Sequence, residues 1–293
     1  MSTRTATRYS IRELQAAAQA LAAGQFAAGP AGSSDTAGTM VLDESPAVST
    51  KAVTPPVAPA SPGLAPLVRV RAANAGAGAS TVALALADVA DVAGIRTRVL
   101  DAAAPAWSGL LGATVTELGA AEGWRRGRRG DGVLIDRVEQ SVRVPAEVPA
   151  PRAIDGVDLT VLDAGWSMRE LAVTTGWVAA TAAHAEVLVT RPNALALSQT
   201  ESALTHLEDQ VVAGHVVVVV VGANRWSDRE FATAGRLLRR AHEQEAVLFA
   251  PLLPAKTLPV LGPDPLPKQL TIPSQRLLER VTTITGPLSA NRT

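Results

Sequence analysis

Short apolar runs alternate with amphipathic segments along the chain, from residue 66 to about residue 285. Most of the strand-like runs are near-continuous in Val, Leu and Ile, which is typical of strands buried on both faces of a sheet. These runs occupy 67–74, 96–102, 157–165, 185–190, 215–224 and 246–252. Helical periodicity falls at 81–93, 167–183, 194–213, 227–243 and 274–283. This order predicts an α/β fold with a doubly wound, mostly parallel sheet and helices on both faces.

The N-terminal residues lack this pattern. Ser10 and Glu13 have capping-box spacing ahead of an apolar helical face, which predicts a short helix over 10–24. That helix is either a frayed appendage or a tethered peptide that binds a protein partner. The following segment is rich in proline and has no aromatic residue, so it cannot bury enough apolar surface to offset its ordering entropy. We expect a helical segment (1–26), a disordered linker (27–65), one domain (66–285) and a flexible tail (286–293).

Composition narrows the class of protein. The 293 residues carry 27 basic and 27 acidic side chains, so no net charge attracts the chain to nucleic acid. The absence of cysteine excludes disulfides and cysteine-ligated metals. The N-terminus lacks an apolar signal region, and the longest apolar stretch, 171–189, is interrupted by polar residues, whereas a membrane span needs about 20 apolar residues. We expect a cytoplasmic protein with no membrane segment.

The segment NAGAGAST, residues 74–81, joins the first predicted strand of the domain to its first helix. Gly76 and Gly78 permit positive φ and the close approach of a ligand. Ser80 and Thr81 open the helix, whose free backbone N–H groups attract phosphate. The pattern therefore predicts a phosphate-binding loop. A dinucleotide fingerprint is the competing interpretation, but Thr81 stands where that motif has its third glycine.

In this loop the chain resembles the ParA/MinD family of P-loop ATPases, whose loop reads KGGxGK[ST]. Gly76 and Gly78 match the loop glycines, and Ser80 matches the magnesium-binding Ser/Thr. Asn74 replaces the family's signature lysine, and Ala79 replaces its phosphate-binding lysine. The resemblance implies a P-loop fold and a site for ATP or ADP with Mg²⁺. It also implies a homodimer, although the contact that the signature lysine makes across the dimer is lost.

Downstream segments extend the resemblance. Asp101 takes the place of the first aspartate of the family's second-strand motif, VLLVDxDPQ, while Ala103 replaces the second, hydrolysis-linked aspartate. VDLTVLDAG resembles the Walker B strand, with Asp163 as its aspartate. The matching segments after the loop are 96–112, 157–165, 184–199, 218–226 and 249–267. The resemblance implies a nucleotide site made of Gly76, Gly78, Ala79, Ser80, Thr81, Asp101, Asp163, Asn224, Arg225 and Pro254, with Ser80 and Asp163 at Mg²⁺.

Three catalytic parts of that site are missing: both lysines and the second aspartate. Loss of one charge-stabilising donor commonly costs about 3–4 kcal/mol of transition-state stabilisation. We therefore expect no catalytic residue. The predicted function is a non-hydrolysing, weakly nucleotide-binding scaffold or regulator in plasmid or chromosome partitioning, conjugation or polar positioning. Two alternatives stay open: an active ATPase that uses a non-standard cation, and a structural interaction module with an empty loop.

Other arginines and a tryptophan bear on these alternatives. Arg69, Arg71, Arg96 and Arg98 lie on or beside the first two predicted strands. They are either candidates for a substitute cation or solvated charges at strand edges, and the second interpretation is favoured. Trp166 follows the Walker B-like strand and fills either the space of a nucleotide or part of the core.

Two basic groups are candidates for contact with nucleic acid or a partner. The segment 123–132 is predicted to be an arginine-rich loop, and the helix 227–243 carries a second basic face. The candidate residues are Arg125, Arg126, Arg128, Arg129, Arg236, Arg239 and Arg240. Weak non-specific DNA binding remains a hypothesis beside the simpler interpretation of solvated charges. The last helix has Arg276 and Arg280 offset by Glu279 and lacks an aromatic anchor, so we expect it to pack on the sheet rather than bind a membrane.

Overall fold

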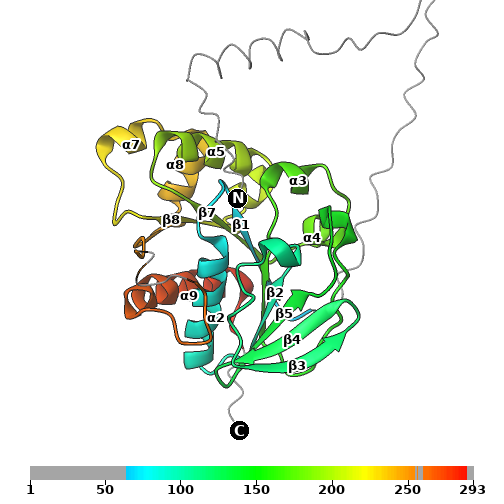
Figure 1. The fold of residues 1–293 in the computed structure, drawn as a ribbon. Coiled ribbons are helices and arrows are strands. Elements are labelled where there is room, and N and C mark those ends of the chain that lie inside the picture. The colour runs from blue at the N-terminus through cyan, green and yellow to red at the C-terminus, as the bar shows by residue number, and fades with distance from the viewer. Residues whose placement is uncertain (1–63, 255, 257–259, 289–293) are drawn as a thin grey trace, which may run out of the picture. The chain divides into compact units, whose positions relative to one another are not determined.

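The computed structural model describes residues 64–254, 256 and 260–288. Within this part of the chain, a nine-stranded sheet has the order β3-β4-β5-β2-β6-β1-β7-β8-β9, and helices cover both of its faces (Figure 1). Pairing is parallel from β5 to β9 in that order and antiparallel among β3, β4 and β5. The predicted doubly wound, mostly parallel α/β fold is confirmed. The helix predicted over 10–24 and most of the linker predicted over 27–65 lie outside the described residues, as do residues 289–293 of the predicted tail.

Six strands form at the predicted positions. Successive Val, Leu and Ile side chains of these strands point to opposite faces of the sheet. The strands are buried along most of their length because helices cover both faces. On β8, for example, Val217 and Val219 enter one core cluster while Val218 and Val220 enter another. The bounds of these strands are β1 (Leu67–Ala72), β2 (Thr97–Asp101), β6 (Leu159–Asp163), β7 (Ala185–Thr190), β8 (Val216–Val221) and β9 (Val247–Ala250).

Helices are divided between the two faces of the sheet. One face packs against α2 (Ala79–Val92) and α9 (Thr271–Thr285). The other packs against α3 (Met168–Ala172), α4 (Trp177–Ala180), α5 (Ala194–Thr205), α6 (Glu208–Val212), α7 (Asp228–Ala232) and α8 (Arg236–Glu243). Three short 3₁₀ turns are η1 (Pro105–Trp107), η2 (Pro145–Glu147) and η3 (Lys268–Leu270). The final helix packs on the sheet as predicted, and none of the described helices is long and apolar enough to cross a bilayer.

The three helices predicted over 167–183, 194–213 and 227–243 are each divided in two, and all of the resulting helices lie on the second face. The break between α3 and α4 contains Gly176, where a Cβ would lie 2.6 Å from the Cα of Ala146. The break between α7 and α8 contains Gly235, where a Cβ would overlap the carboxyl group of Glu201. That carboxylate accepts the first free N–H groups of α8, at 2.8 and 3.0 Å, and so caps the helix. The third break follows His206, and no comparable contact accounts for it.

An antiparallel meander at one sheet edge was not predicted. It consists of β3 (Thr116–Ala121), β4 (Trp124–Arg129) and β5 (Val133–Val138). The prediction of a loop over 123–132 is therefore wrong. Glu122 and Gly123, with φ of 55° and 81°, form the two-residue turn between β3 and β4, and such turns match the twist of a hairpin. The arginine-rich sequence forms a strand because its neighbours supply the carboxylates that it needs.

Candidate functional site

The predicted phosphate-binding loop lies between the carboxyl end of β1 and the start of α2. Gly76 and Gly78 have φ of 68° and 101°, values that favour glycine, and Gly78 is the N-cap residue of α2. A Cβ at either glycine would meet no atom within 4 Å, so the space above the loop is open. The first turn of α2 contains no acidic residue, which leaves the positive end of the helix dipole uncompensated. The loop therefore has the backbone form that attracts an anion.

A cavity of about 960 Å³ opens in front of this loop. It brings together six residues of the predicted site, from the loop and from the Walker B-like strand: Gly76, Gly78, Ala79, Ser80, Thr81 and Asp163. Its other walls include the segments after β2 and β6, together with α3 and α5. These six residues thus share one site, although they come from separate parts of the chain.

Two buried carboxylates are paired beneath the loop, where Asp163 lines the cavity and Asp101 lies beside it without lining the cavity. Asp101 and Asp163 are paired across the neighbouring strands β2 and β6, and both are at most 1% exposed. Asp101 accepts hydrogen bonds from the Ser108 hydroxyl and, at 3.1 Å, from the backbone N–H of Ala103. Asp163 Oδ2 is buried without a hydrogen-bond partner among the described residues. Carboxylate oxygens that lack protein partners next to a hydroxyl are suitable ligands for Mg²⁺ or its bound water.

The pair is also electrostatically unusual. Burial, followed by the charge of Asp101, raises the pKa of Asp163 to about 7, while a hydrogen bond from Ser80 opposes the shift. Burial likewise raises the pKa of Asp101 above its ordinary value, opposed by the hydrogen bonds from Ser108 and Ala103. Two buried carboxyl groups side by side therefore favour either a shared proton or a bound cation.

Comparisons with known proteins agree with this architecture. No family model and no curated protein matches the chain. The septum site-determining protein MinD of Pyrococcus horikoshii, complexed with Mg-ADP, is 17% identical at a TM-score of 0.50, with 76% of this chain and 98% of that chain covered. This chain has the MinD fold. Two further structures are the Pyrococcus furiosus cell division ATPase MinD (17% identity, 75% and 99% coverage, TM-score 0.49) and a putative plasmid partition protein of Borrelia burgdorferi bound to AMPPNP (10%, 75% and 99%, 0.47).

A second, smaller cavity of about 180 Å³ lies beside the loop. It shares Gly78 and Thr81 with the larger cavity, and it extends between α2, α9 and the carboxyl ends of β8 and β9. Its interior is mainly apolar, with Val219, Val221 and Leu277 among its walls. A flat apolar group such as a base fits the chemistry of this lining.

Three residues of the nucleotide site that the resemblance implies do not line this smaller cavity. Asn224 and Arg225 follow β8 but are exposed and line neither of these two cavities. The loop after β9 contributes residues 251–253 to the smaller cavity, whereas Pro254 is exposed and outside its walls. The resemblance assigned these positions by sequence order, and the path of the two loops decides which residues turn inward.

Arg191 is a residue of the site that the sequence analysis did not single out. It follows β7 directly, lines the smaller cavity, and donates from Nε and Nη2 to the carbonyl oxygen of Gly76 at 3.1 and 2.7 Å. The segment around it was matched to the family, but no spacing rule connects it to the loop. Only the parallel pairing of β7 with β1 brings the two together.

The positions where the family has its catalytic groups have other occupants. The Asn74 side chain donates to the Thr190 hydroxyl at 3.0 Å, so it supports the loop from within the domain. Ala103 lies against Gly165, where a Cβ would be 2.5 Å from the Cα of Ala103. Half-buried Trp166 lines the larger cavity and donates from Nε1 to the carbonyl oxygen of Ala102 at 2.8 Å. Both interpretations of Trp166 therefore apply in part, because it occupies space in the cavity and is fixed to the sheet.

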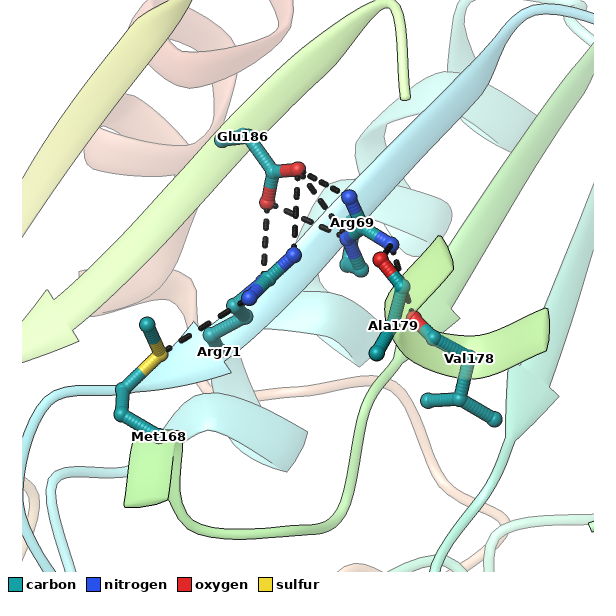
Figure 2. Close-up of polar contacts among 6 residues, drawn as sticks. All are labelled: Arg69, Arg71, Met168, Val178, Ala179 and Glu186. Carbon is teal, nitrogen blue, oxygen red and sulfur yellow. Dashed lines mark hydrogen bonds and ion pairs between the residues drawn. The ribbon is translucent and has the colours of Figure 1, made fainter. Parts of the chain in front are cut away.

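The interpretation of Arg69 and Arg71 as solvated strand-edge charges is wrong. Both are buried and share the carboxylate of Glu186 on the neighbouring strand β7, at 2.5 and 3.0 Å (Figure 2). Arg69 also donates to the carbonyl oxygens of Val178 and Ala179, at the end of α4. Burial lowers the pKa of Arg71 from its ordinary value, although the charge of Glu186 opposes that shift. These arginines are internal parts of the sheet.

The other two candidate arginines, Arg96 and Arg98, lie in different environments. Arg98 is buried and bonded to Asp136, on β5, at 2.5 Å, which again contradicts the solvated interpretation. Arg96 is half-exposed and bonded to Asp158 at 3.4 Å, as expected for a strand-edge charge. Neither lines the two cavities beside the loop.

The arginines of the meander have different environments. Arg129 is buried and bonded to Asp88 of α2 at 2.7 Å, so it cannot contact nucleic acid while the domain is folded. Arg126 is bonded to Asp136 at 2.6 Å. Arg125 and Arg128 are exposed, and they retain the predicted accessibility.

The basic face of α8 is only partly confirmed. Arg236 is exposed and bonded to Glu208, while Arg239 donates to the carbonyl oxygens of Ala232 and Ala234. Arg240 is half-buried. DNA binding by these residues stays a prediction.

Proposed function

We propose that this protein binds a nucleotide, ATP or ADP with Mg²⁺, at the loop 74–81 without hydrolysing it, and acts through protein partners as a scaffold or regulator. The observation that carries the proposal is the meeting, in one cavity, of an open glycine loop with the buried carboxylate of Asp163, which is paired with Asp101 on the neighbouring strand. The MinD fold is consistent with this, since the Pyrococcus horikoshii protein was solved with Mg-ADP. Partitioning, conjugation or polar positioning are the processes in which we place it, on the resemblance of its motifs.

The residues at the floor of the cavity fit Mg²⁺. Asp163 Oδ2 is a buried acceptor that has no hydrogen-bond partner in the described part of the chain, and Ser80 lies beside it. Ser80 and Asp163 would hold the ion, and the charge of Asp101 would strengthen its retention. Bound Mg²⁺ would neutralise phosphate charge. The backbone N–H groups of the loop would orient the phosphates, and the smaller apolar cavity would receive the base.

Loss of hydrolysis follows from the occupants of the catalytic positions. Ala79 and Ala103 bring no charge, and Asn74 is engaged by Thr190. Each missing charge-stabilising group costs about 2.7–4 kcal/mol, or 100- to 1000-fold in rate. The alternative, an active ATPase, requires phosphate release above background that Asp163→Ala abolishes. Absence of such release from a protein that binds nucleotide supports the scaffold.

The test is binding of a fluorescent ATP analogue with Mg²⁺ to wild type and to Gly78→Val. Valine at φ 101° is strained and would place its side chain in the open space above the loop, so saturable binding should be lost. Gly214→Val is a matched control, because Gly214 also has positive φ, 76°, and open space, but lies in the turn between α6 and β8.

Binding by wild type and Gly214→Val, but not by Gly78→Val, supports the proposal. No binding by wild type at millimolar nucleotide would contradict it and favour an interaction module with an empty loop. In that case partners of the segment 10–24 become the first subject of study. Equal loss in both variants would indicate general destabilisation and would also count against a specific role of the loop.

A further inference from the structure

Arg191 occupies the junction of the two cavities that the proposed nucleotide would span. Its guanidinium is fixed to the carbonyl oxygen of Gly76, and Nη1 lies 3.5 Å from the carbonyl oxygen of Val221. It lines the smaller cavity together with Gly78 and Thr81, the two residues that also line the larger one. A ligand with its phosphates on the loop and its base in the smaller cavity would therefore pass beside this side chain.

Arg191 differs from the buried arginines of the domain in having no counter-ion among the described residues. Arg69, Arg71, Arg98, Arg129 and Arg137 each form an ion pair with a carboxylate. The hydrogen bonds of Arg191 within the described residues go to backbone carbonyl oxygens, which are neutral acceptors. A half-buried guanidinium without a counter-ion, next to an anion-binding loop, retains most of its attraction for an anion.

We propose that Arg191 binds the phosphates of the nucleotide and supplies, from the end of β7, a positive charge for ground-state binding at a loop where Asn74 and Ala79 supply none. This inference rests on the proposed function. A phosphate oxygen is a charged acceptor and forms a stronger hydrogen bond with guanidinium than a peptide carbonyl does, so the side chain exchanges Gly76 for the ligand. The ligand class is a nucleoside di- or triphosphate, because a phosphate chain on the loop reaches the guanidinium while its base enters the smaller cavity.

A purely structural role for Arg191 gives different expectations. If it only clamps the loop through Gly76, its loss should lower the stability of the ligand-free protein, and lysine should replace it poorly because lysine lacks the fork that makes two bonds to one oxygen. If it binds phosphate, lysine should restore much of the affinity as a point charge, and the melting temperature without ligand should change little.

The experiment is calorimetric titration of Mg-ATP and Mg-ADP into wild type, Arg191→Gln, Arg191→Lys and Arg128→Gln. The last variant is the charge-matched control, since Arg128 is exposed on β4, away from both cavities. We expect Arg191→Gln to weaken binding of both nucleotides about 10- to 100-fold, the usual effect of losing a hydrogen bond to a charged group. We expect Arg191→Lys to recover most of that loss, and Arg128→Gln to bind within about twofold of wild type.

The possible results separate this inference from the proposed function. Wild type that binds nucleotide, with Arg191→Gln within about twofold of it, overturns the inference and leaves the proposed function intact. An Arg191→Lys variant as weak as Arg191→Gln, with a lowered melting temperature, assigns Arg191 a clamping role and overturns it as well. Wild type without any binding contradicts both.

Discussion

Two groups of buried charged residues lie on opposite faces of the same sheet. The charges of one group are paired with each other, whereas those of the other group are not. Arg69, Arg71 and Glu186 join β1 to β7 on the face of α3 to α8, and each guanidinium is bonded to the carboxylate (Figure 2). Asp101 and Asp163 join β2 to β6 on the face of α2, and neither forms an ion pair within the described residues.

The difference separates an element of the fold from a site. Charges inside a protein are paired or bind a metal, because taking an unpaired charge out of water is costly. The arginine–glutamate group meets this requirement with its own residues, so it needs no ligand. The aspartate pair does not meet this requirement. The free-energy cost of burying two carboxylates without a counter-ion is the reason that we place a cation there.

The largest effect on stability is expected from a change in the group formed by Arg69, Arg71 and Glu186. Glu186→Gln leaves two guanidinium groups buried without a counter-ion, and we expect the free energy of unfolding to fall by about 3–5 kcal/mol. Replacing all three residues by Met should recover most of that loss, since a buried ion group is often no more stable than apolar residues of similar volume. Urea denaturation of the single and triple variants measures both. A loss below about 1 kcal/mol for Glu186→Gln would mean that the group is solvated and the comparison fails.

The second largest effect is expected at Asp163, where a substitution should raise the free energy of unfolding rather than lower it. The pKa of Asp163 is raised to about 7 in the folded protein, against about 3.9 in unfolded chains, so the folded state holds the proton more firmly. Stability should therefore fall as pH rises from about 4 to about 7 and stay level above that. Asp163→Asn should remove this decline and, at pH 8, stabilise the ligand-free protein by about 1–3 kcal/mol.

Denaturation of wild type and Asp163→Asn at pH 5 and pH 8 measures this effect, with exposed Asp155→Asn as control. Mg²⁺ with nucleotide should stabilise wild type at pH 8 more than at pH 6, because the ion competes with the proton, and should not stabilise Asp163→Asn. Destabilisation by Asp163→Asn at pH 8 in the absence of ligand would contradict the view that the pair is uncompensated.

The smallest effect is expected at the surface. Arg125 of β4 and Glu139, which directly follows β5, are bonded at 2.8 Å, but their side chains are 49% and 33% exposed. Water and salt screen such a pair, so Glu139→Gln should change the free energy of unfolding by at most about 1 kcal/mol, and less at high salt. A cost near that of Glu186→Gln would show that burial does not decide the strength of these pairs.

Sequence alone determined the features that depend on local pattern. The Val- and Leu-rich runs predicted six strands at their observed positions, because a strand buried on both faces has few polar residues. The loop glycines and Ser80 were recognised because positive φ and a helix start have residue preferences that act over a few positions. Asp101 and Asp163 were assigned through the resemblance of their strands to the family's motifs, and β2 and β6 do lie side by side.

Tertiary structure decided the features that depend on which distant segments meet. The meander was missed because its arginines resemble a solvated loop until Asp88 and Asp136 are placed against them. Arg69 and Arg71 were misread for the same reason, since Glu186 is more than a hundred residues away. Arg191 reaches Gly76 across 115 positions, only because β7 pairs with β1. A charge takes its meaning from its neighbours, and in a parallel sheet those neighbours come from crossovers that local pattern does not specify.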